Sequence, residues 1–161
     1  MFPLCHYRTN CHFMLANFKK YMITIFLTED DKDDQNIFKE ALDEIEISFL
    51  IANFHNGEEL LEHLENNQDL LPDIIFLDLN MPKLNGMDCL KILRKNPKYA
   101  DLFVAIYSTS GAKENIENAF LNGANAYIKK PGNFNELKSI LKELLSDTVG
   151  DHFAASNLKT F

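Results

Sequence analysis

Short apolar runs and amphipathic segments alternate five times between Met22 and Ser146. The runs are rich in β-branched and aromatic residues, which is typical of buried strands, and they cover residues 22–27, 47–51, 74–77, 102–107 and 126–128. The segments that follow them place apolar residues at helical spacing and predict helices at 33–45, 57–67, 84–95, 112–122 and 133–146. This order predicts an α/β fold in which five parallel strands form a doubly wound sheet with helices on both faces.

The same pattern divides the 161-residue chain into three parts. Residues 22–146 contain the whole alternation and are expected to form one domain. Residues 1–21 carry basic side chains and no acidic ones, and they are expected to be a disordered extension or a stretch translated from a mis-assigned start codon. Residues 147–161 show only weak periodicity, so we expect a frayed or disordered tail.

Composition and charge exclude several classes of protein. Asp and Glu number 24 against 16 Lys and Arg, a net charge of -8, and such a surface repels a phosphate backbone. Direct nucleic-acid binding is therefore not expected. No stretch reaches the roughly 18 apolar residues of a membrane helix, and no signal-peptide cleavage site follows residues 21–27, so no membrane partner is expected. Three cysteines make no disulfide framework, which favours a reducing, cytoplasmic location.

Polar side chains with complementary chemistry follow four of the predicted strands. Glu29 and Asp30 follow the first strand, Asp78 the third, Ser108 the fourth and Lys130 the fifth. Because the carboxyl ends of parallel strands meet at one edge of the sheet, we expect these side chains to converge. Three neighbouring carboxylates repel one another unless a cation compensates them, and a small oxygen-rich set favours Mg²⁺ over Ca²⁺. A lysine opposite the ion leaves room for a dianion such as a phosphoryl group.

Simpler explanations exist for each of these residues taken alone. An aspartate after a strand is often a helix cap, and the acidic run from Glu29 to Asp34 is compatible with a solvated loop. Tyr127, in the fifth strand, is compatible with plain core packing. The combination of all positions at one edge is what favours a functional site.

Five motifs in one order give residues 22–146 a resemblance to the receiver domain of two-component response regulators, and in particular to single-domain, chemotaxis-regulator-like members. The resemblance implies a flavodoxin-like sheet with strand order 2-1-3-4-5. The motifs are Leu27-Thr28-Glu29-Asp30-Asp31, Ile75 to Pro82 with Gly86, Ser108-Thr109, Gly123 to Tyr127, and Lys130-Pro131.

The resemblance implies a role for each acidic position. Asp78 is expected to accept a phosphoryl group from a phosphohistidine and so form an aspartyl phosphate. Glu29 and Asp30 are expected to bind Mg²⁺ together with the Asp78 carboxylate and the main-chain carbonyl of Asn80. The acidic run offers three candidates where the family uses an adjacent pair; we align Thr28 with the end of the strand, which leaves Asp31 as a loop acid.

The resemblance also implies partners for the phosphoryl oxygens. Lys130 is expected to pair with them, Ser108 to donate its hydroxyl, and the Lys130-Pro131 peptide to be cis. Thr109 is larger than the residue often found after this hydroxyl, which could narrow access to the phosphoryl group. In receivers the hydroxyl residue moves toward the phosphoryl group and an aromatic residue turns inward behind it; Ser108 and Tyr127 stand at these switch positions.

A receiver of this kind implies a sensor histidine kinase or a histidine phosphotransfer protein as donor and a downstream protein as target. Its signal is expected to pass either by phosphorylation-dependent binding of that protein or by phosphorelay, in which the phosphoryl group is handed to a histidine phosphotransfer domain. Because the sequence continues for only 15 residues after residue 146, no output domain is expected there. A receiver is not an enzyme, since it turns over no separate substrate. The alternative is a pseudo-receiver that never phosphorylates and acts as an interaction module. A haloacid-dehalogenase-type phosphatase is disfavoured because it needs an aspartate where Asn80 stands, and a dinucleotide-binding fold because acids replace its phosphate-binding glycines.

Overall fold

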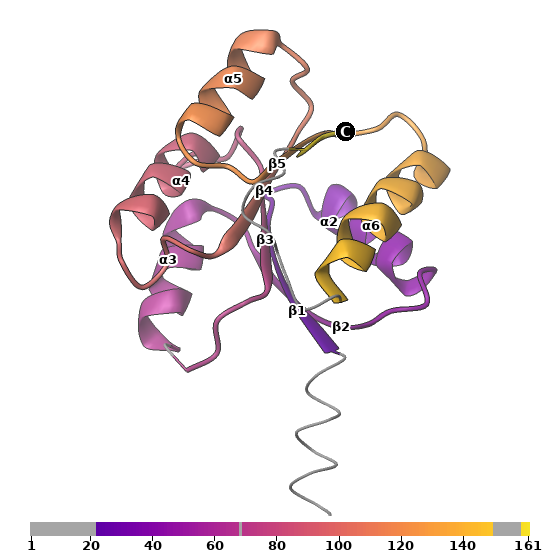
Figure 1. Ribbon diagram of the computed structural model, residues 1–161, viewed down its shortest axis with the longest axis horizontal. Helices are drawn as coiled ribbons and strands as arrows, with labels where there is room; N and C mark the ends of the chain where they lie inside the picture. Colours follow the sequence, from indigo (N-terminus) through magenta and orange to yellow (C-terminus); the bar gives the residue numbers. More distant parts are fainter. Residues whose placement is uncertain (1–21, 68, 150–158) are drawn as a thin grey trace, which may run out of the picture.

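The computed structural model describes residues 22–67, 69–149 and 159–161. In these residues a six-stranded parallel sheet of order β2-β1-β3-β4-β5-β6 lies between two layers of helices (Figure 1). The strands are β1 (Met22–Thr28), β2 (Ser48–Phe54), β3 (Ile74–Leu77), β4 (Phe103–Ser108), β5 (Ala126–Lys129) and β6 (Lys159–Thr160). The helices are α2 (Lys32–Asp43), α3 (Gly57–Asn66), α4 (Gly86–Lys95), α5 (Lys113–Leu121) and α6 (Phe134–Val149). The predicted doubly wound fold and the order of its first five strands are confirmed.

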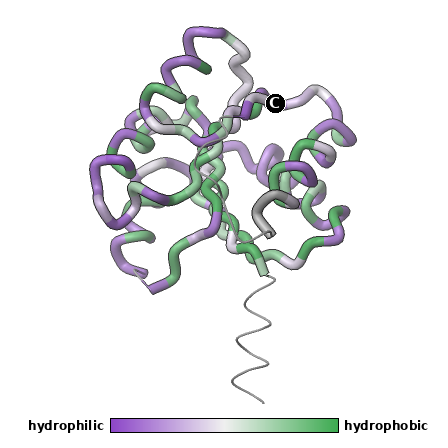
Figure 2. Tube along the Cα trace, in the orientation of Figure 1, coloured by the Kyte–Doolittle hydropathy of each residue, from purple (hydrophilic) through white to green (hydrophobic). Residues whose placement is uncertain are grey.

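Two separate cores hold the helices against the sheet. Helices α2 and α6 cover one face, while α3, α4 and α5 cover the other (Figure 1). Strand β3 serves both cores, because Ile74 and Phe76 face the first and Ile75 and Leu77 the second. This two-sided burial explains why the central strands are continuous apolar runs and why hydrophobic colour concentrates along the middle of the sheet (Figure 2).

The register of the sheet sets the position of the polar residues. The last residue of β1, Thr28, lies beside Leu77 of β3, and Ser108 of β4 lies beside Lys129 of β5. Asp78 N–H then donates to the Thr28 carbonyl at 3.0 Å, and Lys130 N–H to the Ser108 carbonyl at 2.7 Å. The residues that follow β1, β3, β4 and β5 therefore leave the sheet at one edge.

Side-chain caps begin four of the helices in the described residues, and that of α6 is Asn133, which accepts from the N–H of Glu136 at 2.9 Å. Asn56 accepts from the N–H of Glu59 at the start of α3, as predicted from its position before Gly57. Asp31 caps α2 by accepting from Asp33 and Asp34, so the residue expected to be a loop acid has a structural task. Asn85 caps α4 in the same way. Each cap satisfies N–H groups that the first helical turn leaves without a partner.

The C-terminal part differs from the expected tail. Helix α6 continues to Val149, and Lys159–Thr160 pair with β5 as a short sixth strand. Phe161 N–H donates to the Tyr127 carbonyl at 2.9 Å, and its own carbonyl accepts from Lys129 N–H at 3.1 Å. The expectations for residues 1–21 lie outside the described residues, as do those for 150–158. No helix in the described part of the chain has the length and apolarity needed to cross a membrane.

Among the helices of the described residues, none covers one corner of the sheet. Helix α3 has ten residues and spans roughly 15 Å at 1.5 Å per residue, whereas the seven residues of β2 span roughly 23 Å. The amino-terminal ends of β1 and β2 are thus open on the α3 side and form the floor of an apolar groove of about 690 Å³. Four large, exposed hydrophobic residues line it: Met22, Leu50, Leu70 and Leu71.

Candidate functional site

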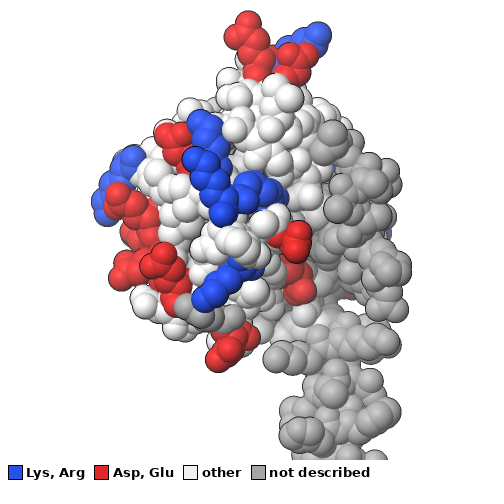
Figure 3. All heavy atoms as spheres, turned by 60° about the vertical axis from the view of Figure 1, so that its left-hand side comes forward, with Lys and Arg blue, Asp and Glu red and all other residues white. Residues whose placement is uncertain are grey.

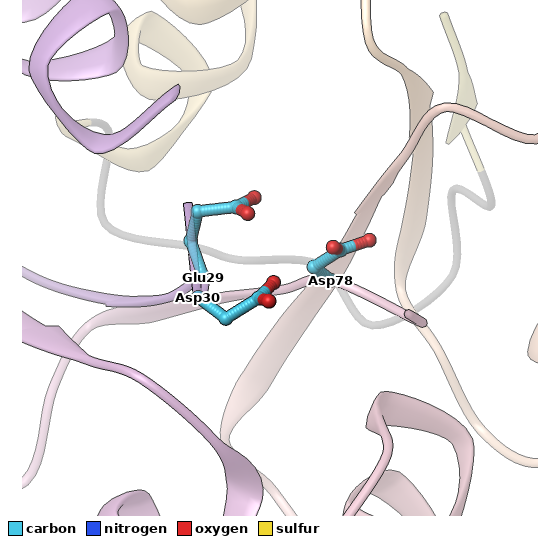
Figure 4. A group of neighbouring side chains, drawn as sticks. All are labelled: Glu29, Asp30 and Asp78. Atoms are coloured by element: carbon cyan, nitrogen blue, oxygen red, sulfur yellow. The ribbon is translucent and has the colours of Figure 1, made fainter. Parts of the chain in front are cut away.

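Three carboxylates meet at the carboxyl edge of the sheet. Glu29 and Asp30 follow β1 and Asp78 follows β3, and one carboxylate oxygen of each lies within 4.8 Å of the other two (Figure 4). Glu29 and Asp78 are buried, with exposed fractions of 1% and 5%, while Asp30 is open to solvent. The convergence predicted from the strand ends is present.

Burial makes this cluster electrostatically unfavourable without a cation. Desolvation raises the pKa of Glu29, and it likewise raises the pKa of Asp78. The charge of Lys130 acts in the opposite direction on both groups but does not cancel the effect of burial. Repulsion from Asp78 adds to the rise at Glu29, and repulsion from Asp30 adds to the rise at Asp78.

Lys130 supplies the positive charge inside the cluster. Its Nζ lies 2.6 Å from Glu29 Oε2, 2.7 Å from Asp34 Oδ2 and 3.6 Å from Asp78 Oδ2. The same ammonium stands 5.2 Å from the centre of the Tyr107 ring. Burial acts to lower the pKa of Lys130, but the hydrogen bonds to Asp34 and Glu29 outweigh it, so the pKa is raised and the side chain stays charged.

The two predicted switch residues are buried next to this edge. Ser108 ends β4, the strand beside β3, and is fully buried; its Oγ accepts from Ser110 N–H at 3.3 Å. Tyr127 is also fully buried, and its hydroxyl donates to the Ser110 carbonyl at 2.8 Å. The aromatic side chain is thus in its inward position and is linked to the loop that follows Ser108. Thr109 is exposed.

Gly86 lets the chain pass close behind Asp78. A Cβ atom at Gly86 would lie 2.0 Å from the Asp78 carbonyl oxygen, so no other residue fits without moving the backbone. Gly86 N–H also donates to the Leu79 carbonyl at 3.3 Å. This contact explains why a glycine stands eight residues after the central aspartate in the motif.

The donor set fits a hard divalent cation. Asp78 Oδ1 is buried and has no hydrogen-bond partner among the described residues, a costly state for a carboxylate oxygen. A cation bound by oxygens of Glu29, Asp30 and Asp78 would satisfy this atom and offset the repulsion. Asn80 is exposed two residues after Asp78, and the role of its main-chain carbonyl stays a prediction.

One expectation for this site is wrong. The Lys130-Pro131 peptide is trans, as are all peptide bonds of the described residues. The two isomers of a peptide bond before proline differ by only about 0.5–1 kcal/mol, so the local sequence does not decide between them.

Three residues around the site were not found from the sequence. Asp34, in the first turn of α2, reaches Lys130 from 96 positions away, and Tyr107 supplies an aromatic face to the same ammonium. Gln35 anchors the loop before α2, since its Nε2 donates to the Glu29 carbonyl at 2.6 Å. The only sequence signal for Asp34 was its place in the acidic run, which was equally compatible with a solvated loop.

Residues 25–142 match the response regulator receiver domain family. This chain belongs to that family. The receiver is 29% identical over 126 residues to a chemotaxis protein CheY homolog of Campylobacter jejuni, an alignment of 78% of this chain and 92% of the relative. It is 34% identical over 124 residues to the transcriptional regulatory protein CpxR of Klebsiella pneumoniae. That alignment covers 77% of this chain but 50% of the relative.

Solved structures agree with this assignment. The phosphorylated cyanobacterial phytochrome response regulator RcpA superposes with a TM-score of 0.74 at 28% identity and covers 81% of this chain and 96% of its own. Family membership makes the chain a two-component signalling receiver and not a true enzyme. It also implies a histidine kinase as partner in general.

Proposed function

We propose that this receiver accepts a phosphoryl group on Asp78 in a Mg²⁺-dependent reaction and transmits the signal by binding another protein. The observation that carries the proposal is the environment of Asp78: its Oδ1 has no hydrogen-bond partner among the described residues, while its Oδ2 lies 3.6 Å from a buried ammonium. An oxygen without a partner is available to a cation or a phosphorus atom. The neighbouring charge stabilises an incoming dianion.

In the proposed reaction an Asp78 carboxylate oxygen attacks the phosphorus atom of a phosphohistidine. The new P–O bond forms as the P–N bond breaks, and the imidazole leaves with the electron pair of that bond and is neutralised by a proton. Lys130 pairs with the phosphoryl oxygens and Ser108 donates its hydroxyl to them. Bound to Glu29, Asp30, Asp78 and the Asn80 carbonyl, Mg²⁺ would neutralise charge that develops on the phosphoryl group.

The proposed output is a change of affinity for a partner. The burial of Ser108, the last residue of β4, and of Tyr127, in the neighbouring strand β5, supports a switch in which both respond to the phosphoryl group. The proposed donor is a sensor histidine kinase or a histidine phosphotransfer protein, and the proposed target is a protein in the cytoplasm. Neither nucleic acid nor a membrane is among the proposed direct partners.

Intact-mass measurement after incubation with acetyl phosphate tests the proposal. Wild type is expected to gain one phosphoryl group with Mg²⁺ and none without it, and Asp78→Asn is expected to gain none while staying folded by circular dichroism. Asp33→Asn, a change of one exposed acid in the nearby helix turn, is the matched control and is expected to behave as wild type.

Two results would contradict the proposal. One is a gain that persists in Asp78→Asn, which places the modification elsewhere. The other is a wild type that binds Mg²⁺ but takes no phosphoryl group from acetyl phosphate, phosphoramidate or a phosphorylated histidine phosphotransfer protein. That second result favours an interaction-only pseudo-receiver.

A further inference from the structure

Lys130 forms ion pairs with two acids, of which only one belongs to the cluster of converging carboxylates. Its two short contacts are to Glu29 Oε2 at 2.6 Å and to Asp34 Oδ2 at 2.7 Å. Glu29 belongs to the group of carboxylates whose oxygens converge to within 4.8 Å of one another, whereas Asp34 does not. A divalent cation in that group therefore competes with Lys130 for Glu29 and leaves Asp34 untouched.

The competition follows from charge. A carboxylate oxygen that coordinates a divalent ion has little negative charge left for an ammonium, and the ammonium is repelled by the ion itself. Glu29 Oε1 is also engaged, since it accepts from Asp31 N–H at 3.2 Å. When a cation occupies the site, Asp34 is the short-range partner that remains for Lys130.

Asp34 is held in place to serve as that partner. It lies in the first turn of α2, where Asp31 Oδ1 accepts both the Asp33 N–H at 2.8 Å and the Asp34 N–H at 3.3 Å. Its side chain is 37% exposed, so solvent screens the ion pair only in part, and the Lys130 side chain is 11% exposed. An anchored acid of this kind fixes the ammonium at less entropic cost than a mobile one.

We propose that Asp34 is a positioning residue, which keeps the Lys130 ammonium beside Asp78 once a divalent cation has engaged Glu29. The inference rests on the proposed function of Asp78. An ammonium has three N–H donors, and that of Lys130 directs two of them to Glu29 and Asp34. With Glu29 withdrawn, Asp34 holds one donor and the others are directed to the phosphoryl oxygens on Asp78.

Binding of beryllofluoride, an analogue of the phosphoryl group, tests the proposal in the full chain with saturating Mg²⁺. Asp34→Asn is expected to weaken beryllofluoride binding on the order of tenfold, the range for losing a hydrogen bond to a charged group that is partly exposed. Asp33→Asn is the control, because it removes the same charge from the exposed side chain that precedes Asp34 in the sequence. This variant is expected to bind beryllofluoride as wild type does. Asp34→Glu, which keeps a carboxylate, is expected to recover most of the affinity.

A second readout separates positioning from a general effect on the acidic cluster. The affinity for Mg²⁺ alone is expected to change no more in Asp34→Asn than in Asp33→Asn, because Asp34 is not among the converging carboxylates. A crystal structure of the wild type with Mg²⁺ and beryllofluoride is expected to keep the hydrogen bond from Lys130 Nζ to Asp34 and to lose the one to Glu29.

The proposal fails if Asp34→Asn and Asp33→Asn bind beryllofluoride equally well, or if the crystal structure shows Lys130 released from Asp34. Either result leaves the proposed function intact provided that the wild type takes up a phosphoryl group on Asp78. A wild type that takes up none overturns the proposed function first, and this inference with it.

Discussion

The two ends of the sheet differ in which side chains are exposed to solvent. At the carboxyl end, Glu29 and Asp78 are charged groups shut away from solvent, with exposed fractions of 1% and 5%. At the amino end, Leu50 and Leu70 are apolar groups left in solvent, with exposed fractions of 57% and 61%. Both arrangements destabilise the folded protein, and the burial of the apolar strand segments between them offsets this cost.

The difference arises because the loops of this fold cover the carboxyl end of the sheet more completely than the amino end. At the carboxyl end, segments after β1, β3, β4 and β5 converge and cover the carboxylates. At the amino end, the strands are covered only as far as the helices extend, and α3 ends before it reaches the amino-terminal ends of β1 and β2. Charged side chains on the helical face shown in Figure 3 are interspersed with uncharged surface and reach solvent, unlike the buried Glu29 and Asp78. A buried cluster that opposes stability points to a function, because nothing in the packing requires it.

Removing the lysine charge is expected to have the largest effect on the carboxyl end. Lys130→Met keeps most of the side-chain volume but leaves buried carboxylates without compensation, and we expect a loss of about 3 kcal/mol in the free energy of unfolding without Mg²⁺. Urea unfolding measures it, with Lys129→Met as control, since Lys129 is exposed. Mg²⁺ is expected to recover part of the loss. An equal effect of both variants would contradict the account of the cluster.

Closing the space behind Asp78 is expected to cost somewhat less. In Gly86→Ala the new Cβ overlaps the Asp78 carbonyl, and we expect a loss of about 2 kcal/mol together with slower phosphorylation as Asp78 is displaced. Gly132→Ala is the matched control because no atom lies within 4 Å of its Cβ position. Thermal unfolding and intact-mass kinetics measure the two effects. A Gly86→Ala variant as stable as Gly132→Ala would show that the backbone there adjusts freely.

Removing the central carboxylate is expected to stabilise the protein, and the gain is expected to depend on pH. Desolvation raises the pKa of Asp78 in the folded protein, so the ionised form is penalised at neutral pH. Asp78→Asn removes this penalty and is expected to raise stability on the order of 1 kcal/mol at pH 7 without Mg²⁺.

The sign of the pH dependence follows from the same shift. As pH falls through the raised pKa of Asp78 toward the ordinary value of 3.8, the folded wild type takes up a proton before the unfolded chain does and regains stability. The advantage of Asp78→Asn over wild type is therefore expected to shrink in that window. Unfolding curves between pH 7 and pH 4 measure it, and a gap that widens on acidification would contradict the raised pKa.

At the amino end the smallest effect is expected. Leu50→Ser replaces a leucine that is mostly in solvent, so stability is expected to change by less than about 0.5 kcal/mol. Binding of the dye ANS is expected to fall, because the apolar groove loses part of its floor. Leu121→Ser, at an exposed leucine outside the groove, is the control. A large loss of stability in Leu50→Ser would show that the groove is packed in solution.

Sequence pattern alone located the elements that are buried on both faces. The run at 74–77 was predicted with the bounds that the structure gives β3, because every residue there is apolar and fully enclosed. Strand β2 was predicted at 47–51 and lies at Ser48–Phe54, since pairing of Thr28 with Phe54 carries the strand past the polar Asn53. Edge strands take their bounds from the neighbour that they pair with, and a local pattern does not contain that neighbour.

Some features of the site could likewise be predicted from the sequence, and others could not. By itself the sequence determined that Glu29, Asp30, Asp78 and Lys130 share one edge, because residue order and parallel pairing leave no other arrangement. Only the tertiary structure decided that Asp34 reaches Lys130, that Lys130-Pro131 is trans, and that β6 joins β5. These features depend on side-chain reach, on two nearly equal isomers and on a short strand. Differences in energy that small are settled by the packing around them.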